Sequence, residues 1–410
     1  MLPSLTPDEE RHSRAAAALI GEQLAAAGGW LSFEQFMELA LYTPGVGYYS
    51  AGSVKIGAGG DFVTAPEVSD LFSRCVAQQC ADVLAETGGG LLELGAGTGR
   101  MAATVLESLA KIGVLPDQYA ILEVSADLAE RQRARIQQLP AALRERVVWL
   151  ERLPVAPVRG VILANEVLDA LPFRRFVVRD DAARELGVTV DAGAFVWAEA
   201  AVDAGDVGAA RVTGGAGGAG SAGQAVSADW DVAAVATLLR DLPFALPDGY
   251  MSEICPRVGP WIASVGECLG QGALLLFDYG LPRTHYYHPD RTDGTLRCYF
   301  KQRAHDDPFI NIAVQDITAW VDFTRVAEAA LDANLEVAGF ATQAAFLLGN
   351  GIEAMTAESS DVADRARLAG EARRLLLPGE MGESFKVMAL CRNLEQPLRG
   401  FAYQDLRRSL

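Results

Sequence analysis

The chain has 410 residues, half of them hydrophobic, and a formal net charge of −18 at pH 7. This length suggests two domains, or one domain with large additions. The acidic balance argues against a nucleic-acid partner, because phosphate binding requires a basic face; a cationic partner or simple solubility fits it better.

Neither the start of the chain nor its cysteines indicate an exported protein. The opening MLPSLTPDEERHSR carries acids and has no apolar signal core, so we expect no secretory signal or mitochondrial transit peptide, and a cytoplasmic location. No charge-free apolar run reaches the roughly 20 residues of a membrane span. The six cysteines form no C-x-x-C pair and there are four histidines, so we expect no metal site and no disulfide scaffold.

Three helices are predicted before residue 90. Residues 14–27 are alanine-rich and end at Gly28 and Gly29. Ser32 is placed to cap a second helix that ends before Pro44, and Ser69 a third helix over about 71–86. Between the last two, the glycine- and aromatic-rich segment 45–67 is predicted to be an ordered loop.

From residue 90 onward, short apolar strands alternate with helices. Strands are predicted at LLELG, YAILEVS, VVWLE, VILANE and ALLLFDYG, and helices at about 99–112, 128–139 and 256–270. Near-continuous apolar strands separated by helices indicate an α/β fold with a mostly parallel sheet and helices on both faces. LEVAGFATQ and SFKVMALCR are predicted to close the sheet at its far edge.

Two excursions interrupt this pattern. Residues 173–200 alternate like a β-hairpin and are followed by a glycine- and alanine-rich stretch, 204–226, predicted to be a flexible surface loop. The other excursion covers 282–324. The predicted organisation is a helical N-terminal region with a covering loop at 1–89, a core at 90–395 with insertions at about 173–250 and 282–324, and a C-terminal tail at 396–410.

The stretch LLELGAGTGR, residues 91–100, predicts a strand that enters a tight turn and then a helix. Its spacing is G-x-G-x-G, not the G-x-G-x-x-G of dinucleotide folds, and Glu93 precedes the first glycine by two residues. A carboxylate there would repel pyrophosphate, which disfavours an NAD-dependent oxidoreductase, and the absence of G-K-[ST] excludes an ATP phosphate loop. The carboxylate suits the amino group and sulfonium of S-adenosylmethionine, and the glycines allow close approach of the backbone.

Acidic residues also follow two later strands. Glu123 could accept hydrogen bonds from both ribose hydroxyls, as in NAD sites, or be a solvated acid at a strand end. Asn165, Glu166 and Asp169 follow the fourth strand, where parallel sheets bind ligands. Alternatively, these three residues form the start of a helix, with Asn165 as its cap.

These motifs, in this order, resemble class I S-adenosylmethionine-dependent methyltransferases. The stretches LALYTPGVGYYS, GGDFVTAPEVSDLF, GTLRCYFKQRAHDDPFINIAVQDITAWVDF and GFATQAAFLLGNGI are similar to the MidA family, over about residues 15–395. Mitochondrial members of that family assist assembly of respiratory complex I by methylating an arginine of a complex subunit. The chain departs from the family pattern at Ala313-Val314, where glycine is usual, and at Trp320, where histidine is usual; both departures concern the substrate more than the cofactor.

The resemblance implies a Rossmann-like class I fold with S-adenosyl-L-methionine as cofactor and S-adenosyl-L-homocysteine as product. It implies that segment 60–67 folds over the cofactor, with Thr64, Pro66 and Glu67 nearest to it. The other predicted cofactor-binding residues lie in the strand-end motifs: Glu93, Gly95, Ala96, Gly97, Gly99, Glu123, Val124 and Asn165.

An arginine substrate would require carboxylates that hold its guanidinium group and offset the growing positive charge. The candidate catalytic residues are Glu166, with Asp169 or Glu253 in support, and His305; Asp278 and Tyr279 end the fifth strand at the same edge. A surface acid at Glu253 and a loop histidine bonded to backbone at His305 are the plain alternatives.

We therefore expect the substrate to be a protein that presents arginine, with no nucleic-acid or membrane partner, and a homodimer is possible. A small-molecule methyltransferase, an NAD-dependent oxidoreductase and a cofactor-binding assembly factor without turnover are the alternatives.

Overall fold

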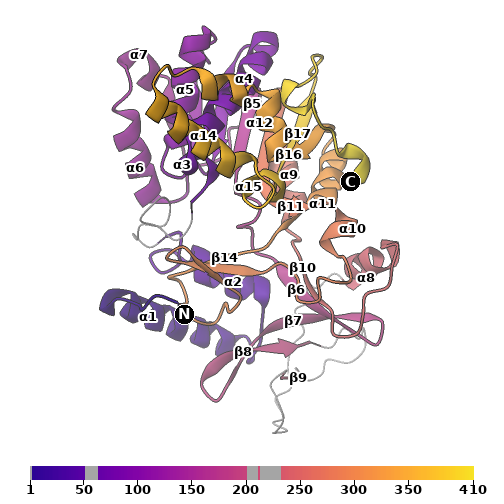
Figure 1. The fold of residues 1–410 in the computed structure, drawn as a ribbon. Coiled ribbons are helices and arrows are strands. Elements are labelled where there is room, and N and C mark those ends of the chain that lie inside the picture. Colours follow the sequence, from indigo (N-terminus) through magenta and orange to yellow (C-terminus); the bar gives the residue numbers. More distant parts are fainter. Residues whose placement is uncertain (1, 51–62, 201–210, 213–231) are drawn as a thin grey trace. The chain divides into compact units, whose positions relative to one another are not determined.

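The computed structural model describes residues 2–50, 63–200, 211–212 and 232–410 (Figure 1). The chain forms two compact units. The first contains residues 1–53, 170–257 and 284–320, and the second contains residues 54–169, 258–283 and 321–410. Part of the predicted ordered loop, 51–62, and nearly all of the predicted flexible loop 204–226 lie outside the described residues.

The second unit is built on one large sheet. Its strands are β2 (Gly90–Leu94), β3 (Tyr119–Leu122), β4 (Val147–Leu150), β5 (Val158–Asn165), β11 (Leu269–Leu281), β15 (Val321–Asp322), β16 (Glu336–Thr342) and β17 (Phe385–Arg392). The strand order is β16-β17-β11-β5-β2-β3-β4, with β15 beside β11. All pairs from β4 to β11 are parallel, and only β17 runs antiparallel to its neighbours. The predicted mostly parallel sheet, closed by the last two strands, is confirmed.

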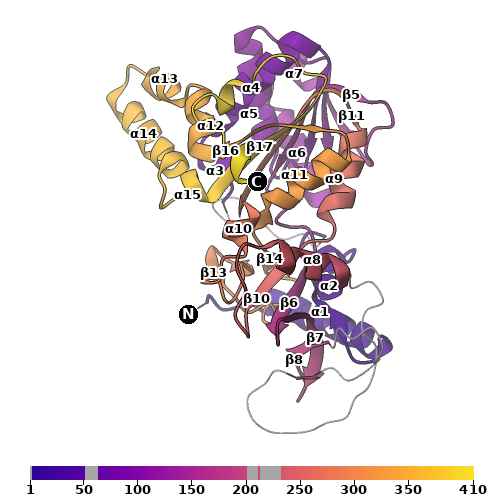
Figure 2. The same ribbon diagram turned by 90° about the vertical axis from the view of Figure 1, so that its right-hand side faces the viewer.

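Helices cover both faces of this sheet. They are α3 (Ala65–Val68), α4 (Asp70–Thr87), α5 (Arg100–Ile112), α6 (Ala126–Ile136), α7 (Ala141–Arg144), α9 (Val258–Glu267), α11 (Phe323–Asp332), α12 (Gln343–Gly349), α13 (Ile352–Ala357), α14 (Val362–Leu376) and α15 (Met381–Ser384), with the short 3₁₀ turns η1 (Arg399–Phe401) and η2 (Arg407–Ser409). Phe277 of β11 packs against Phe72 of α4 and Phe346 of α12, with ring centroids 5.3 Å apart in each pair. Helices α9 and α11 lie on the opposite side of the sheet from α12–α14 (Figure 2).

The first unit contains mainly antiparallel strands. Its elements are α1 (Pro7–Ala26), β1 (Leu31–Ser32), α2 (Phe33–Tyr42), β6 (Arg174–Arg179), β7 (Ala182–Asp191), β8 (Ala194–Glu199), β9 (Arg211–Val212), α8 (Val232–Asp241), β10 (Met251–Ile254), β12 (Arg297–Phe300), β13 (Arg303–His305) and β14 (Asp316–Thr318), with α10 (Arg283–Tyr286) at the boundary. One sheet has the order β10-β6-β7-β8-β9 with β1 beside β7, and a smaller sheet has the order β13-β12-β14. The predicted hairpin at 173–200 is therefore confirmed.

Side-chain caps explain where the first helices begin. Ser32 Oγ accepts from Gln35 N at 3.2 Å, and Gln35 Oε1 accepts from Ser32 N at 3.0 Å, so two of the free backbone donors at the start of α2 are satisfied. Ser69 Oγ accepts from Leu71 N at 3.1 Å at the start of α4. The predicted caps are thus confirmed. Helix α1 begins earlier than the predicted residue 14, because Thr6 provides a cap upstream of Pro7.

The boundaries of the two units differ from the predicted domain boundaries. Residues 54–89, predicted to belong with the N-terminal region, group with the large sheet. Residues 1–53 group with the two insertions instead, through contacts such as the pairing of β1 with β7. The insertions therefore supply most of a separate compact unit.

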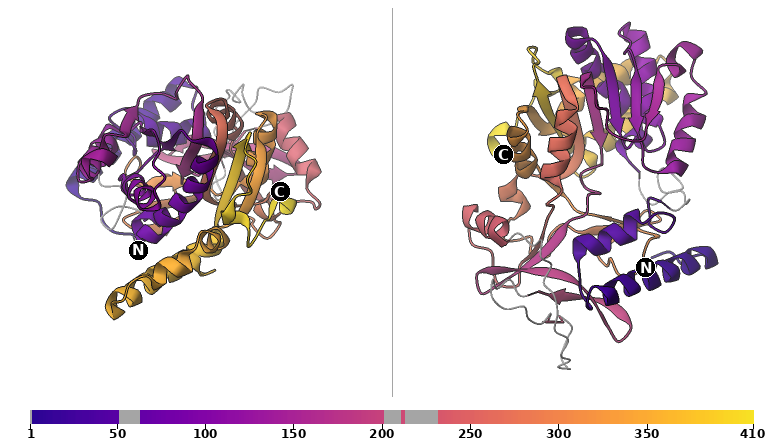
Figure 3. Two further views of the ribbon diagram at one scale, coloured as in Figure 1. Left: turned by 90° about the horizontal axis from the view of Figure 1, so that it is seen from above. Right: turned by 180° about the vertical axis from the view of Figure 1, so that it is seen from behind.

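A row of three glycines crosses the centre of the large sheet, whose strands are visible from behind in Figure 3. Gly160 of β5 lies opposite Gly90 of β2 on one side and Gly272 of β11 on the other. Gly160 and Gly272 have φ angles of 122° and 132°, which residues with a Cβ rarely adopt. A Cβ on Gly160 would lie 2.1 Å from the Gly90 carbonyl oxygen. The three strands therefore have no room for a side chain in this row.

We predict that Gly160→Ala lowers the free energy of unfolding by about 3 kcal/mol or more, because it combines a disallowed backbone angle with a backbone clash. Gly113→Ala is the matched control: Gly113 has a φ of 86°, but its added Cβ would meet no atom within 4 Å. The control should cost only about 1 kcal/mol, from the left-handed backbone alone. Urea unfolding of both variants measures the difference, and equal losses would contradict the clash.

Candidate functional site

The glycine turn joins β2 to α5 in a conformation that requires glycine. Gly95, Gly97 and Gly99 have φ angles of 66°, 54° and 78°. Gly95 N donates to Leu122 O at 3.0 Å, which attaches the turn to the end of β3. A Cβ on Gly99 would lie 3.1 Å from Gln132 Cα of α6, tighter than most real contacts. The turn is therefore held closely between the neighbouring strand and the next helix.

Glu93 lies beneath this turn and is nearly inaccessible to solvent, at 1% exposure. Tyr119 Oη donates to Glu93 Oε2 at 2.6 Å. Burial raises the pKa of Glu93 to about 7, although the hydrogen bond from Tyr119 opposes this shift. Glu93 thus supports the turn from within the core, and a direct contact with the cofactor stays a prediction.

Glu123 and Val124 follow the end of β3 and lie at the carboxyl edge of the sheet. Ser125 N donates to Glu123 Oε1 at 2.9 Å, and Gln132 Nε2 donates to Glu123 Oε2 at 2.9 Å. These donors orient the carboxylate, as binding of ribose hydroxyls requires. The Val124 side chain is 83% exposed, which is unusual for valine next to a polar site. Its apolar surface is suited to packing against a flat base such as adenine.

The described part of the predicted covering segment is attached to the glycine turn. Thr98 Oγ1 donates to Glu67 Oε1, and Arg100 Nη1 donates to Glu67 O at 2.8 Å. Thr64 and Pro66 are buried at the start of the same short helix, α3. Residues 60–62 of the predicted segment lie outside the described residues.

An acidic cluster lies where β5 and β11 end. The buried Asp278 carboxylate accepts from Leu168 N at 3.0 Å and from Asp169 N at 3.2 Å. Tyr279 Oη donates to Asp169 Oδ2. Burial, Asp169 and Glu166 together raise the pKa of Asp278 well above its usual range. The structure therefore brings two predicted catalytic residues, Glu166 and Asp169, together with Asp278.

Asn165 and Glu166 begin the loop that carries this cluster. Glu166 has a φ of 53°, and its N–H donates to Phe277 O of β11 at 2.8 Å. Asn165 Nδ2 donates to Glu166 Oε1 at 3.3 Å. Asn165 Oδ1 is buried and accepts no hydrogen bond from any described residue. A buried acceptor without a donor suits a ligand that brings N–H or O–H groups, as S-adenosylmethionine does.

Glu253 and His305 belong to the first unit. Glu253 is 1% exposed, so its interpretation as a surface acid is wrong. Its carboxylate accepts from Arg175 Nε at 3.1 Å and Thr295 N at 2.7 Å, contacts that hold the 290s loop onto β10. Asp307 N donates to His305 Nδ1 at 3.3 Å, and burial lowers the pKa of His305. These contacts give both residues a local structural role, and their catalytic roles stay predictions.

The side chains that support the site from behind were not predicted from the sequence. These are Tyr119 below Glu93, Thr98 and Arg100 at the covering segment, and Gln132 and Trp149 behind Glu123. A signal was available for Gln132: it falls on the apolar stripe of its helix, between Leu128 and Ile136. A polar residue at such a position requires a buried partner.

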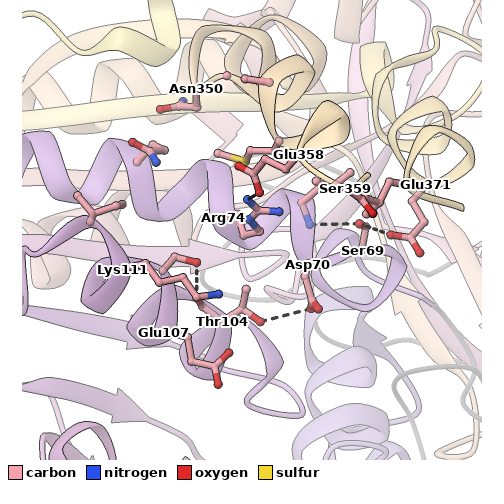
Figure 4. Close-up of a pocket in the computed structure, with 18 of the residues that line it drawn as sticks. Ser69, Asp70, Arg74, Thr104, Glu107, Lys111, Asn350, Glu358, Ser359 and Glu371 are labelled. Carbon is pink, nitrogen blue, oxygen red and sulfur yellow. Dashed lines mark hydrogen bonds and ion pairs between the residues drawn. The ribbon is translucent and has the colours of Figure 1, made fainter. Parts of the chain in front are cut away.

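A cavity of about 860 Å³ lies elsewhere in the second unit, between α4, α5 and α12–α14 (Figure 4). None of the predicted site residues lines it. Three of its five cations are paired with acids of its own lining: Arg74 with Glu358, Arg100 with Asp70 at 2.9 Å, and Arg367 with Glu371 at 2.6 Å. Its lining also carries five acids, so its charges nearly balance, and we place the functional site at the glycine turn.

The fold and the site define an S-adenosylmethionine-dependent methyltransferase. The family of S-adenosyl-L-methionine-dependent methyltransferases matches residues 75–341, and the chain belongs to this family, the MidA family. The fold is the class I methyltransferase fold and the cofactor is S-adenosyl-L-methionine. The alternative of an NAD-dependent oxidoreductase is therefore wrong.

Individual relatives agree with this assignment. A crystal structure from Burkholderia thailandensis with bound S-adenosyl-homocysteine is 37% identical, covers 100% of both chains and has a TM-score of 0.88. The mitochondrial protein arginine methyltransferase NDUFAF7 of Danio rerio is 26% identical over 89% of this chain and 84% of its own length. The human NDUFAF7 is 25% identical over 92% of this chain and 83% of its own length. Within the described ranges, no helix is long and apolar enough to cross a membrane.

We predict that Glu123→Ala weakens S-adenosylhomocysteine binding about 100-fold, because two hydrogen bonds from ribose hydroxyls to a carboxylate are lost. Calorimetric titration measures this change, with NAD as a ligand expected not to bind. Glu151→Ala, at an exposed position just after β4, is the control and should bind like the wild type. Equal affinity of the Glu123 variant and wild type would remove Glu123 from the cofactor site.

Glu93 should make stability depend on pH. Its folded pKa of about 7 exceeds the unfolded value of 4.5, so the folded state holds an extra proton between these values. This contribution to stability is complete below pH 4.5 and is lost as pH rises through 7, by about 3 kcal/mol in all. Glu93→Gln keeps an acceptor for Tyr119 and cannot titrate. Urea unfolding at pH 5 and pH 8 should show that the free energy of unfolding falls less between these pH values in the variant than in the wild type. An identical fall in both proteins would show that Glu93 does not titrate in this range.

Proposed function

We propose that the chain transfers a methyl group from S-adenosyl-L-methionine to an arginine side chain of a protein substrate. The observation that carries this proposal is the acidic cluster of Glu166, Asp169 and Asp278 at the carboxyl edge of the sheet. The names of the relatives, protein arginine methyltransferases at 25–26% identity, support the same substrate.

The electrostatics of the cluster favour a cationic ligand. The neighbouring carboxylates Asp169 and Glu166 raise the pKa of Asp278, because charging all three acids together is unfavourable. A cation bound among them would relieve this repulsion. Within the described ranges, no group of three or more His, Cys, Asp and Glu side chains is arranged to hold a metal ion. An organic cation therefore fits better than a metal.

A guanidinium group matches this arrangement in shape as well as in charge. It is planar, stays protonated, and presents paired N–H donors that carboxylates bind bidentately. Bound S-adenosyl-L-methionine supplies an activated methyl group. Glu166 and Asp169 would hold one guanidinium nitrogen in line with that methyl group, and Tyr279 would keep Asp169 in place through their hydrogen bond. The proton that this nitrogen loses on methylation would pass to one of the two carboxylates.

The proposal also includes expectations about partners and location. A partner protein that presents arginine is expected, a nucleic acid or membrane partner is not, and a homodimer and a cytoplasmic location stay predictions. A small-molecule methyltransferase, or an assembly factor that binds cofactor without turnover, would have the same cofactor site. These two alternatives are outcomes of the experiment that follows.

We predict that the purified enzyme, given methyl-labelled cofactor and a cell extract, forms methylarginine that is detected after acid hydrolysis. Glu166→Gln should lower the rate about 100-fold and leave S-adenosylhomocysteine affinity unchanged within about threefold, since the carboxylate acts on the substrate. Glu151→Gln, an exposed neutralisation, is the matched control. Label only in small molecules would favour the first alternative. Cofactor binding without any transfer would favour the second.

A further inference from the structure

Gln132 is a fully buried amide on an otherwise apolar helix face. It lies on α6 one turn from Leu128 and one turn from Ile136, all of which point into the protein. A buried side-chain amide is costly unless its donors and acceptor are hydrogen-bonded. Leucine would fill this place at no such cost. The glutamine therefore requires an explanation from its partners.

Its partners lie on three different elements. Gln132 Nε2 donates to Gly97 O of the glycine turn at 3.0 Å and to Glu123 Oε2 after β3 at 2.9 Å. Gln132 Oε1 accepts from Trp149 Nε1 of β4 at 3.0 Å. Both amide hydrogens and the amide oxygen are used. The side chain thus joins the two segments that surround the cofactor.

These partners also determine which way the amide points. Gly97 O and the Glu123 carboxylate can only accept, so they require the NH₂ end, and the Trp149 indole can only donate, so it requires the oxygen end. Arg133 lies over the Trp149 ring at 5.0 Å and helps to hold it. A flipped amide would place an oxygen against two acceptors. The indole therefore makes the bridging orientation the stable one.

We propose that Gln132 is a positioning residue for the cofactor, which holds the Gly97 carbonyl and the Glu123 carboxylate at a fixed separation, with Trp149 setting its orientation. The inference rests on Glu123 as the acceptor of the ribose hydroxyls. Gln132 itself lies behind both groups and acts through them. Pre-organisation of this kind raises affinity because the site does not have to be ordered when the ligand binds.

The experiment compares two ligands in each variant: S-adenosylhomocysteine and its 2′,3′-dideoxy analogue, which lacks the ribose hydroxyls. Gln132→Leu should weaken S-adenosylhomocysteine binding about 30-fold, since a hydrogen bond to a charged group is lost at the ribose site. Binding of the dideoxy analogue should weaken far less. The ratio of the two affinities, which favours the hydroxyl-bearing ligand, should therefore narrow by about tenfold. Gln138→Leu, an exposed position just after α6, is the control and should leave both affinities unchanged.

If Gln132 contributes to stability alone, the variant should bind both ligands more weakly by the same factor. The ratio of the two affinities would then equal that of the wild type, and this result would overturn the proposal. Unchanged binding of S-adenosylhomocysteine in a folded Gln132→Leu protein would overturn it too. Trp149→Phe provides a second, milder variant if Gln132→Leu does not fold. It removes the indole donor and keeps a smaller aromatic ring beneath Arg133. The affinity ratio of the two ligands should narrow by about threefold, and an unchanged ratio in this variant would count against the proposal. Failure of Glu123→Ala to weaken binding would instead remove the ribose assignment on which the inference rests.

Discussion

The arrangement of the site depends on how carboxylates are stabilised at the carboxyl edge of a parallel sheet. A buried carboxylate without donors is costly, and here each one receives donors from a neighbouring segment. Tyr119 of β3 donates a hydrogen bond to Glu93 of β2, and backbone N–H groups after β5 donate to Asp278 of β11. The hydrogen bonds that keep these acids in the protein also fix the spacing of the strand ends. The same hydrogen bonds therefore determine both the geometry of the site and the stability of the sheet edge.

These acids differ in how deeply they are buried, and their roles differ accordingly. Glu93 is sealed below the turn, where burial raises its pKa to about 7, so it contributes a weakened negative charge at neutral pH. Glu123 follows its strand end, and its carboxylate accepts hydrogen bonds from Ser125 N and Gln132 Nε2. Asp278 is buried but shares its surroundings with Asp169 and Glu166. A positively charged methyl donor and a cationic acceptor would both approach an edge that carries this negative potential.

The alternation of apolar strands and helices was enough to predict the large sheet, because both faces of every central strand are buried. The caps at Ser32 and Ser69 were predictable because they depend on local sequence alone. Which segments form each of the two units could not be predicted, because residues 1–53 join the insertions through contacts between positions far apart in the sequence. Glu253 could be read as a surface acid because its partner Arg175 is far away along the chain.

The strand-end motifs are visible in the sequence, but the side chains that support them are not. Glycines, and acids that end apolar runs, are visible in one segment of sequence. Gln132 becomes meaningful only when α6 is packed against the glycine turn, so that its amide reaches Gly97 O and Glu123 together. Its place on an apolar stripe showed that it has a buried partner, but not which partner.

Glu166 shows the limit of sequence patterns most clearly. Its φ of 53° lies in the left-handed region, which costs a non-glycine residue of this kind about 1 kcal/mol. Two hydrogen bonds hold it there: its N–H donates to Phe277 O, and Asn165 Nδ2 donates to its carboxylate. Backbone strain persists only where the surrounding contacts over-determine it, and it gathers at functional sites. A glycine would relieve the strain but would remove the carboxylate, so keeping an acid in this conformation is best explained by a need for its charge at this edge.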